Sequence, residues 1–374
     1  MKLFLFKCLY YFLRLFIRIK KRIFIYSDNY YDSPRFIVEK MHELYPGYDV
    51  VFMPFDNIHV QNGFVPDYVL VKRHSWFSFC TLLLSSFCVI NNFEFTSIFI
   101  KRKKQLFIQT YHGDRGPKKI LFDCDSSVEC LDNKVTDLMI VGSKFGAERA
   151  LSAFRYTGKI LQIGMPRNDQ LIIPDNNKAL EIRKRLNIPD NKKVLLYAPT
   201  FRNVPTDYSK NIDLKRINQL LNEEYVILVR MHRADKQKDL FVKNGTAMDV
   251  SWYPDVSDIL LITDYLITDY SSVAFDFALR LKPIILYMFD YCEYIKSSRG
   301  LMFDIKDCGL KTAFTKEELE DVVLNTSHTV FAELDLQSLA FFGTTETGKS
   351  ANIICEVIND EYTKRFVTND KLDK

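Results

Sequence analysis

The stretch at residues 194–202, VLLYAPTFR, joins a short apolar run directly to a proline, a threonine and an arginine. A short apolar run bounded by a turn residue is typical of a buried strand in a parallel sheet. The pattern recurs at 225–233, YVILVRMHR, and at 266–272, LITDYSS. A helical pattern at 214–221 separates the first two runs, so this part of the chain is predicted to consist of βαβ units.

The amino-terminal half shows the same alternation of apolar runs and helical patterns. The expected strands are 22–26, 48–53, 68–72, 89–90, 105–110, 137–141 and 159–163, and the expected helices are 33–44, 77–87 and 143–154. Alternating strands and helices predict a second parallel sheet.

One stretch, residues 164–178, interrupts this rhythm with a glycine and two prolines. A domain boundary there agrees with the length of the chain, because 374 residues suit two domains. The predicted fold class is therefore α/β, with two Rossmann-like domains at 26–165 and 166–350 and a carboxyl-terminal helix at 351–374.

The first 25 residues combine large apolar side chains with bases, which are Lys2, Lys7, Arg14, Arg18, Lys20, Lys21 and Arg22. The bases recur too often for a membrane-spanning helix, which needs ~20 nearly uninterrupted apolar residues. Residues 1–25 are therefore predicted to form an amphipathic helix on an anionic membrane surface. The alternative is an ordinary helix that packs on its own domain. The eight cysteines form no CxxC pair, which favours a reducing compartment. Together with the expected amphipathic helix, this predicts a peripheral position at the cytoplasmic face of the membrane.

Ligands of open α/β sheets bind beyond the carboxyl ends of the strands, so residues that directly follow strands are candidate site residues. In the carboxyl-terminal half these residues are Thr200, Arg202, Arg230, Asp269, Ser271 and Ser272. The arginines bring positive charge to one rim. The serines begin an expected helix, where hydroxyls, backbone N–H groups and the helix dipole suit a phosphate. In the first half, His112 follows a strand, and Gly113 allows a close backbone turn toward a ligand.

This combination suits a donor that carries a diphosphate. Phosphoryl transfer needs a base near the attacking hydroxyl and positive groups around the phosphates. A histidine can take a hydroxyl proton near neutral pH, so His112 or His232 is the candidate base and the other is a candidate phosphate contact. Each residue type also has a plain structural interpretation: serines cap helices, histidines lie in cores and arginines form surface ion pairs.

Five segments can be compared with known families: 109–113 (QTYHG), 164–169 (GMPRND), 197–202 (YAPTFR), 230–232 (RMH) and 267–272 (ITDYSS). Together they resemble the CDP-glycerol glycerophosphotransferase family, the teichoic acid primases and polymerases. The resemblance implies a glycosyltransferase-B-like fold, in which the first domain faces the acceptor and the second domain holds the donor nucleotide.

Members of this family transfer glycerol phosphate, or in some cases ribitol phosphate, from the CDP-activated form to an acceptor hydroxyl and release CMP. The resemblance therefore implies a CDP-glycerol or CDP-ribitol donor and a lipid-linked or polysaccharide acceptor, in teichoic acid or capsule-like polymer synthesis. It implies that His112 is the base and that His232 contacts the donor phosphate with catalytic weight. The diphosphate is expected to be held by Asp269, Ser271 and Ser272. Arg167 becomes a substrate-binding candidate because it lies in a matching segment, and no tightly bound cofactor, metal site or nucleic-acid partner is expected.

The loop after His112 departs from the usual pattern of the family, in which His-Gly precedes Thr-Pro and a lysine. Residues 114–119 read DRGPKK here, so the acceptor is not predicted. Two other functions fit the same residues. One is a nucleotide-sugar glycosyltransferase of the same fold, and the other is a catalytically inert membrane-bound binding module.

Overall fold

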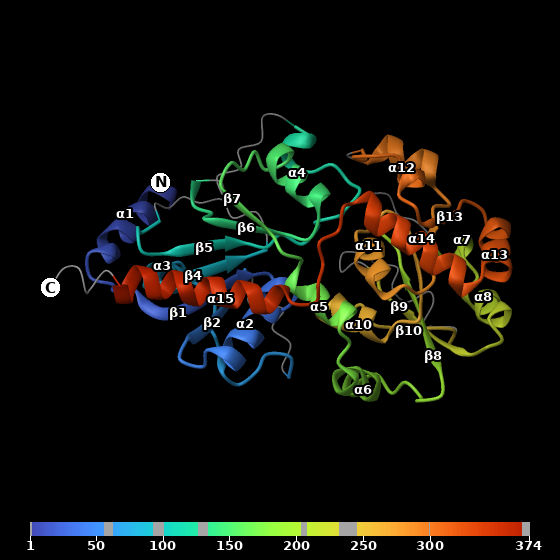
Figure 1. The fold of residues 1–374 in the computed structure, drawn as a ribbon, viewed down its shortest axis with the longest axis horizontal. Helices are drawn as coiled ribbons and strands as arrows, with labels where there is room; N and C mark the ends of the chain where they lie inside the picture. The colour runs from blue at the N-terminus through green and yellow to red at the C-terminus, as the bar shows by residue number, and fades with distance from the viewer. Residues whose placement is uncertain are drawn as a thin grey trace. The chain divides into compact units, whose positions relative to one another are not determined.

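The computed structural model describes residues 2–55, 63–92, 101–125, 134–202, 208–231, 245–298 and 300–368. The chain forms two compact units, whose helices and strands are labelled in Figure 1. Unit 1 comprises Met1–Asp114, Asp125–Asp169 and Thr345–Lys374, and unit 2 comprises Arg115–Cys124 and Gln170–Thr344.

Unit 1 contains a parallel sheet of seven strands in the order β3-β2-β1-β4-β5-β6-β7. The strands are β1 Lys20–Ser27, β2 Asp49–Pro54, β3 Val69–Val71, β4 Ser86–Asn91, β5 Leu106–Gln109, β6 Leu138–Val141 and β7 Lys159–Gln162. The helices are α1 Lys2–Arg14, α2 Asp32–Leu44, α3 Trp76–Ser85, α4 Lys144–Ser152, η3 Pro166–Asn168, α15 Ser350–Tyr362 and η6 Thr363–Thr368. The strand order reverses between β1 and β4, and ligands of such sheets bind at the carboxyl ends of the strands beside this reversal.

The sheet of unit 1 buries apolar side chains on both faces, as parallel sheets do. Along β1, Ile23 and Ile25 belong to the cluster that includes residues of α2 and α15, whereas Phe24 belongs to the cluster on the opposite face, with residues of α3. This alternation follows from the two-residue period of a strand. Figure 1 shows α15 in red, crossing the same face as α2.

The amino-terminal segment differs from the single helix expected over residues 1–25. Helix α1 ends at Arg14, and the chain enters β1 at Lys20. The end of α1 is held by Arg102, whose guanidinium donates to the carbonyl oxygens of Arg14 at 3.1 Å and of Ile17 at 2.5 Å. The cation thus satisfies the carbonyl group of the last helical residue, which the helix leaves without a partner, and one in the turn that follows. Within the described ranges, no helix has the length and apolar character needed to cross a bilayer.

The division into units also differs from the expected domains at 26–165 and 166–350. The boundary lies between Asp169 and Gln170, and residues from Thr345 onward return to unit 1. Asp169 anchors this return, because its carboxylate accepts the N–H groups of Ser350 at 2.9 Å and Ala351 at 2.7 Å, at the start of α15. Asp169 is distant in sequence from the helix that it caps, so local sequence periodicity could not predict this contact.

Unit 2 contains a parallel sheet of six strands in the order β10-β9-β8-β11-β12-β13. The strands are β8 Lys193–Ala198, β9 Tyr225–Val229, β10 Met248–Asp249, β11 Tyr265–Thr268, β12 Ile284–Tyr287 and β13 Lys311–Ala313. The helices are η1 Leu121–Asp123, α5 Asp169–Ile172 (which begins at the last residue of unit 1), α6 Asn176–Arg185, α7 Tyr208–Asn211, α8 Leu214–Leu220, α10 Val256–Ile262, α11 Val273–Phe277, η4 Ala278–Arg280, α12 Tyr291–Ser297, η5 Ile305–Asp307, α13 Lys316–Asn325 and α14 His328–Phe341.

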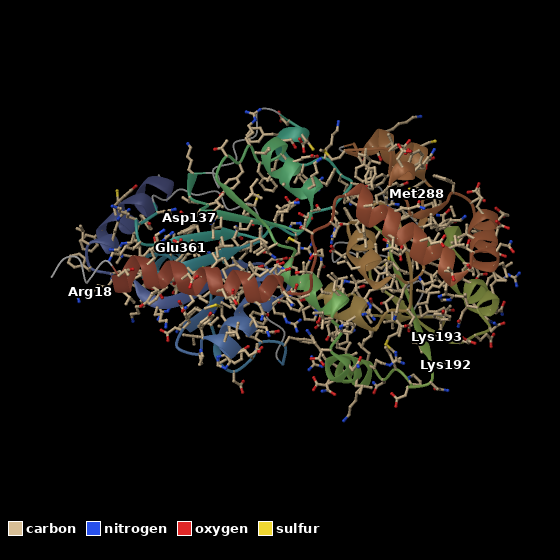
Figure 2. All side chains as sticks on the ribbon, viewed as in Figure 1. Arg18, Asp137, Lys192, Lys193, Met288 and Glu361 are labelled. Carbon is tan, nitrogen blue, oxygen red and sulfur yellow. The ribbon has the colours of Figure 1, made fainter. Side chains whose placement is uncertain are left out.

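Charged residues at the amino ends of the unit 2 strands form surface pairs. Lys193, labelled in Figure 2, begins β8 and lies 2.8 Å from Glu224, and about half of each side chain is exposed. The neighbouring Lys192 donates to the carbonyl oxygen of Glu223. These lysines lie at the edge opposite the carboxyl ends of the strands, where ligands of this fold bind.

Candidate active site

The candidate base His112 lies at the carboxyl edge of the unit 1 sheet, in the loop after β5. Its side chain is exposed, and Nδ1 lies 3.0 Å from the carbonyl oxygen of Asn92, which directly follows β4. The preceding residue, Tyr111, has a φ of +29°, in a region that residues with a Cβ rarely adopt. Its ring packs edge-on against Phe154, with 4.9 Å between the ring centroids. The loop therefore holds a strained turn that places His112 next to the reversal in strand order.

Three hydrogen bonds anchor the loop after His112. The carbonyl oxygen of Gly113 accepts a hydrogen bond from Nη1 of Arg149 in α4, at 2.7 Å. The buried carboxylate of Asp114 accepts from Oγ of Ser143 at 2.7 Å and from the N–H of Gly142 at 3.1 Å. Asp114, which belongs to the segment that departs from the family pattern, is thus part of the support of the loop.

Arg167, predicted to contact substrate, lies in the interior of unit 1 with 3% of its surface exposed. Its Nη1 atom lies 3.2 Å from Oδ1 of Asp32, at the start of α2, and donates to the carbonyl oxygen of Tyr111 at 3.4 Å. The geometry gives Arg167 a supporting role beneath the His112 loop, and its contact with substrate stays a prediction.

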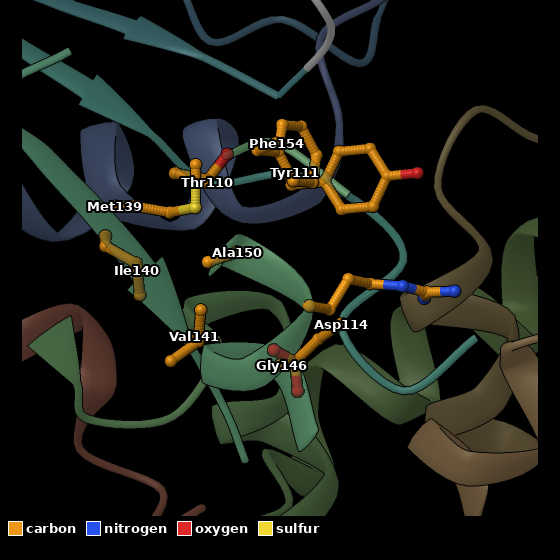
Figure 3. Close-up of a pocket in the computed structure, with 10 residues that line it drawn as sticks. Thr110, Tyr111, Asp114, Met139, Ile140, Val141, Gly146, Ala150 and Phe154 are labelled. Atoms are coloured by element: carbon orange, nitrogen blue, oxygen red, sulfur yellow. The ribbon is translucent and has the colours of Figure 1, made fainter. Parts of the chain in front are cut away.

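A small pocket lies among β5, β6 and α4 (Figure 3). It encloses about 250 Å³ of empty space, part of it open to solvent, and is lined by Thr110, Tyr111, Asp114, Met139, Ile140, Val141, Gly146, Arg149, Ala150 and Phe154. The enclosed part has room for only about one water molecule, far less than the sites that bury a drug-sized ligand. His112 is not among the lining residues, so the pocket is a gap in the packing under the loop and not a nucleotide site.

In unit 2, Asp269 connects the end of β11 to the end of β8. Its Oδ1 accepts the N–H groups of Thr200 at 2.8 Å and Tyr270 at 2.7 Å, and its Oδ2 lies 2.8 Å from Nη2 of Arg202. Asp269 is buried, and a carboxylate repels phosphate. Its position therefore favours a role in shaping the two loops over the predicted direct contact with a diphosphate.

Arg202 is shared between two carboxylates. Its Nε lies 2.6 Å from Oδ2 of Asp290, in addition to its contact with Asp269. Its guanidinium carbon lies 4.7 Å from the ring centroid of Tyr294 and 5.1 Å from that of Tyr270. Burial alone would lower the pKa of Arg202, but the two carboxylates together raise it above the usual value. The arginine thus stays charged and organises the strand ends.

Arg230 follows β9 and holds the loop after β10. Its Nη1 donates to the carbonyl oxygens of Val250 at 2.9 Å and Tyr253 at 2.6 Å, and its Nη2 to that of Pro254 at 3.5 Å. The predicted cation at this rim is therefore present, and three backbone carbonyls take part of its hydrogen-bonding capacity.

Ser271 and Ser272 lie directly after β11 and are partly exposed, as expected. The N–H of Val273 donates to Oγ of Ser271 at 3.4 Å, and Ser272 makes no side-chain cap to α11. The helix expected to begin after the serines is present as α11, which ends at Phe277 and continues as the 3₁₀ helix η4 to Arg280. The two hydroxyls and nearby N–H groups remain the candidate diphosphate contacts. The other candidate catalytic residue, His232, lies outside the described residues.

Some supporting residues were not predicted from sequence. Asn92, Arg149 and Asp290 each stabilise a loop that carries a candidate. The position of Asn92 directly after a buried apolar run could have marked it as a candidate. Nothing in the local sequence marks Arg149, since a single base on a helix usually faces solvent. Among the residues that the structure describes, no group of three or more histidine, cysteine or carboxylate side chains could hold a metal ion.

Comparison with known proteins gives a consistent result. The family model for CDP-Glycerol:Poly(glycerophosphate) glycerophosphotransferase matches residues 9–358. A teichoic acid poly(glycerol phosphate) polymerase of Staphylococcus epidermidis is 36% identical over 73% of this chain and 40% of its own length. A teichoic acid glycerol-phosphate transferase of Staphylococcus aureus is 33% identical over 69% of this chain and 72% of its own length. The chain thus spans less than half of the first relative and about three quarters of the second.

Solved structures agree with the predicted fold. The wall teichoic acid polymerase TagF has a TM-score of 0.81 and 27% identity, over 96% of this chain and 94% of that one. A TagF variant soaked with CDPG has a TM-score of 0.80, 28% identity and coverages of 93% and 90%. The Staphylococcus aureus MnaA-UDP structure, with a TM-score of 0.55 and 14% identity, shares the fold alone. The predicted fold class, α/β with two Rossmann-like sheets and glycosyltransferase-B-like, is confirmed.

Proposed function

The chain belongs to the CDP-Glycerol:Poly(glycerophosphate) glycerophosphotransferase family, and from this premise we propose that it transfers glycerol phosphate, or another polyol phosphate, from a CDP-activated donor to an acceptor hydroxyl in teichoic acid or capsule-like polymer synthesis. The observation that carries the proposal is the placement of His112, exposed at the carboxyl edge of the unit 1 sheet and fixed by the carbonyl oxygen of Asn92. Relatives named as polymerases and transferases of glycerol phosphate support it.

In the proposed reaction the acceptor hydroxyl attacks the phosphorus that carries the polyol. A P–O bond to the acceptor forms, the P–O bond to CMP breaks, and the hydroxyl proton passes to His112. CMP leaves with the electron pair of the broken bond. In-line transfer of this kind needs mainly positioning and charge stabilisation from the protein.

On the donor side, the proposed diphosphate contacts are the hydroxyls of Ser271 and Ser272 and, from the family resemblance, His232. Arg202 and Arg230 are engaged by carboxylates and carbonyl groups within unit 2. The charge of Arg202 is balanced by two carboxylates, so its proposed role is to fix the loops. Arg230, which donates to neutral carbonyl groups, is proposed to supply positive charge to the rim.

The test is CMP release by purified protein given CDP-glycerol, CDP-ribitol or a nucleotide sugar, each with a polyprenyl-linked or polysaccharide acceptor. Release with one CDP-polyol supports the proposal and identifies the donor. Nucleoside phosphate release with a nucleotide sugar alone would indicate the sugar transferase, and no turnover with any donor would indicate the inert binding module.

The role of His112 is tested in the same assay. His112→Ala should lower kcat by roughly 10²- to 10⁴-fold, because it removes a general base. His42→Ala is the matched control, since His42 is exposed and stacks on Tyr68 near the end of α2, far from the carboxyl ends of the strands. Near wild-type turnover by the His112 variant would exclude it as the base.

We also propose that unit 1 binds the cytoplasmic face of an anionic membrane, where a lipid-linked acceptor would be presented. Exposed large apolar side chains gather on the neighbouring helices α1 and α3 and on the residues after α1: Phe12, Leu15, Phe16, Trp76 and Phe77 are 59–78% exposed. The exposed bases Arg18 and Lys20 follow in sequence. Apolar groups flanked by bases suit insertion into anionic lipid headgroups.

Liposome sedimentation tests this membrane contact. Binding should require anionic lipid and weaken with salt, which screens charge over ~8–10 Å at ordinary ionic strength. A Phe12→Ser, Phe16→Ser double variant should lose binding. Trp252→Ser is the control, because Trp252 is an exposed aromatic residue of unit 2. Equal loss in both variants, or binding that ignores salt and lipid charge, would refute the proposed surface.

A further inference from the structure

The hydrogen-bond partner of His112 determines which of its ring nitrogens carries a proton. Nδ1 lies 3.0 Å from the carbonyl oxygen of Asn92. A carbonyl oxygen has no hydrogen and can only accept, so Nδ1 must be the donor. A neutral imidazole carries one proton, and the lone pair that can take a second proton is then on Nε2.

The carbonyl that receives this hydrogen bond is itself held in place. Asn92 is fully buried, and its Oδ1 accepts from Oγ of Ser27 at 2.9 Å, at the end of β1. The neighbouring carbonyl oxygen of Asn91 accepts the N–H of Thr110 at 2.8 Å, which joins β4 to the start of the His112 loop. The acceptor of the Nδ1 hydrogen bond is thus part of the rigid sheet edge.

The loop is fixed from its other side by Arg149. This arginine is 3% exposed, and its Nη1 donates to the carbonyl oxygen of Gly113, the residue after His112, at 2.7 Å. A hydrogen bond from a charged donor is stronger than a neutral one. This guanidinium, buried on α4, therefore restrains the peptide that joins Gly113 to Asp114, one residue beyond the imidazole, and so limits movement of the loop that carries His112.

We propose that Arg149 is the positioning residue of the base, and that it holds His112 as the Nδ1–H tautomer so that Nε2 accepts the proton of the acceptor hydroxyl. The inference rests on the proposed function of His112. Arg149 acts through the carbonyl of Gly113 and touches no reacting atom. After proton transfer both ring nitrogens carry hydrogen, and the Nδ1–H group continues to donate to Asn92, whose carbonyl dipole stabilises the imidazolium.

Steady-state kinetics test the positioning role. Arg149→Met keeps the apolar stem and removes the donor, and it should lower kcat by roughly 10- to 100-fold while the KM for the donor changes less than twofold, as expected for misplacement of a reacting group. Arg149→Lys should restore most of kcat, because an ammonium group can donate to the same carbonyl. Lys144→Met, an exposed base on the same helix, is the matched control. Wild-type kcat in Arg149→Met would overturn the proposal.

The tautomer is measured directly, without turnover, from the imidazole ¹⁵N signals of the full chain labelled at histidine. The signal of His112 among the six histidines is assigned by its loss in His112→Asn. We expect a protonated Nδ1 and an unprotonated Nε2 in the wild-type protein, even if Arg149→Met fails to fold. A protonated Nε2 would overturn the inference while CMP release could persist. Absence of CMP release with an intact Nδ1–H tautomer would instead refute the proposed function.

Discussion

The Nη2 atom of Arg202 lies 2.8 Å from Oδ2 of Asp269, and both side chains are buried within unit 2. The pair joins the segments that follow β8 and β11, and the same carboxylate also accepts the N–H of Thr200. The two loops that carry most of the candidate donor contacts are therefore joined through the carboxylate of Asp269.

Removal of Arg202 should destabilise unit 2 strongly. Arg202→Met leaves Asp269 and Asp290 buried without their cation, and breaking a buried pair in this way costs about 3–5 kcal/mol. Urea denaturation measures the loss. Arg216→Met is the control. Its pair with Glu320 lies at the surface, where about half of the arginine and a third of the glutamate side chain are exposed, and its loss should change the unfolding free energy by no more than about 1 kcal/mol. Similar losses in both variants would contradict the prediction.

Gly146 is expected to tolerate no side chain. A Cβ at this position would lie 1.8 Å from Oδ1 of Asp114, so Gly146→Ala must displace the buried carboxylate that supports the His112 loop. We expect a stability loss of about 1–3 kcal/mol and a lower kcat. Gly47→Ala is the control, since the nearest atom is Nζ of Lys21, at 3.5 Å. Thermal unfolding and CMP release check both variants, and an unaffected Gly146→Ala would show that the loop can rearrange.

Arg115 and Asp276 should be coupled energetically. Nη2 of Arg115 lies 2.8 Å from Oδ1 of Asp276, and the arginine side chain is fully buried. A double-mutant cycle with Arg115→Leu and Asp276→Leu should give a coupling energy of about 0.5–3 kcal/mol. The exposed pair of Lys193 and Glu224 is the reference and should give less than about 1 kcal/mol. Additive effects at Arg115 and Asp276 would contradict the coupling.

Asp335 should make the stability of unit 2 depend on pH. It is buried in α14, its Oδ2 has no hydrogen-bond partner, and burial raises its pKa to about 8, compared with 3.8 for an ordinary aspartate. Between these values the folded protein binds one more proton than the unfolded chain, so its unfolding free energy falls as pH rises, by at most about 1.4 kcal/mol per pH unit.

Asp335→Asn removes this titration and keeps the shape of the side chain. Its melting temperature relative to the wild type should therefore rise between about pH 4 and pH 8. Calorimetry at several pH values gives this difference, in which titrations common to both proteins cancel. A difference that is constant with pH would mean that Asp335 is ionised in the folded protein or is solvated.

The ends of strands could be predicted from the sequence because they depend mainly on neighbouring residues. The run at 194–197 is apolar and is followed at once by Pro199 and Thr200, and β8 ends at Ala198. The loop with His112 and the serines after β11 follow the same rule, because parallel strands place all such residues at one edge of their sheet.

The partners of the candidate residues were not predictable, because they come from distant parts of the chain. Arg202 was expected to face phosphate. In the structure it pairs instead with two carboxylates, and one of them, Asp290, is distant in sequence. The predicted amino-terminal helix was longer than the observed one. Arg102, which caps the observed helix at Arg14, is also distant in sequence. Nothing in the sequence around His112 indicates a contact with Arg149. The hydrogen bond from Arg149 to the carbonyl of Gly113 depends on how α4 packs against the loop.

The return of Thr345–Lys374 to unit 1 has a consequence for biosynthesis. The apolar face that includes Ile37 of α2 is completed by Ile354 and Ile358 of α15, which leave the ribosome only after all of unit 2 has been made. At ~5–20 residues per second, the nascent chain carries this face uncovered throughout that interval. Unit 1 therefore closes its hydrophobic core last, although most of it is synthesised first.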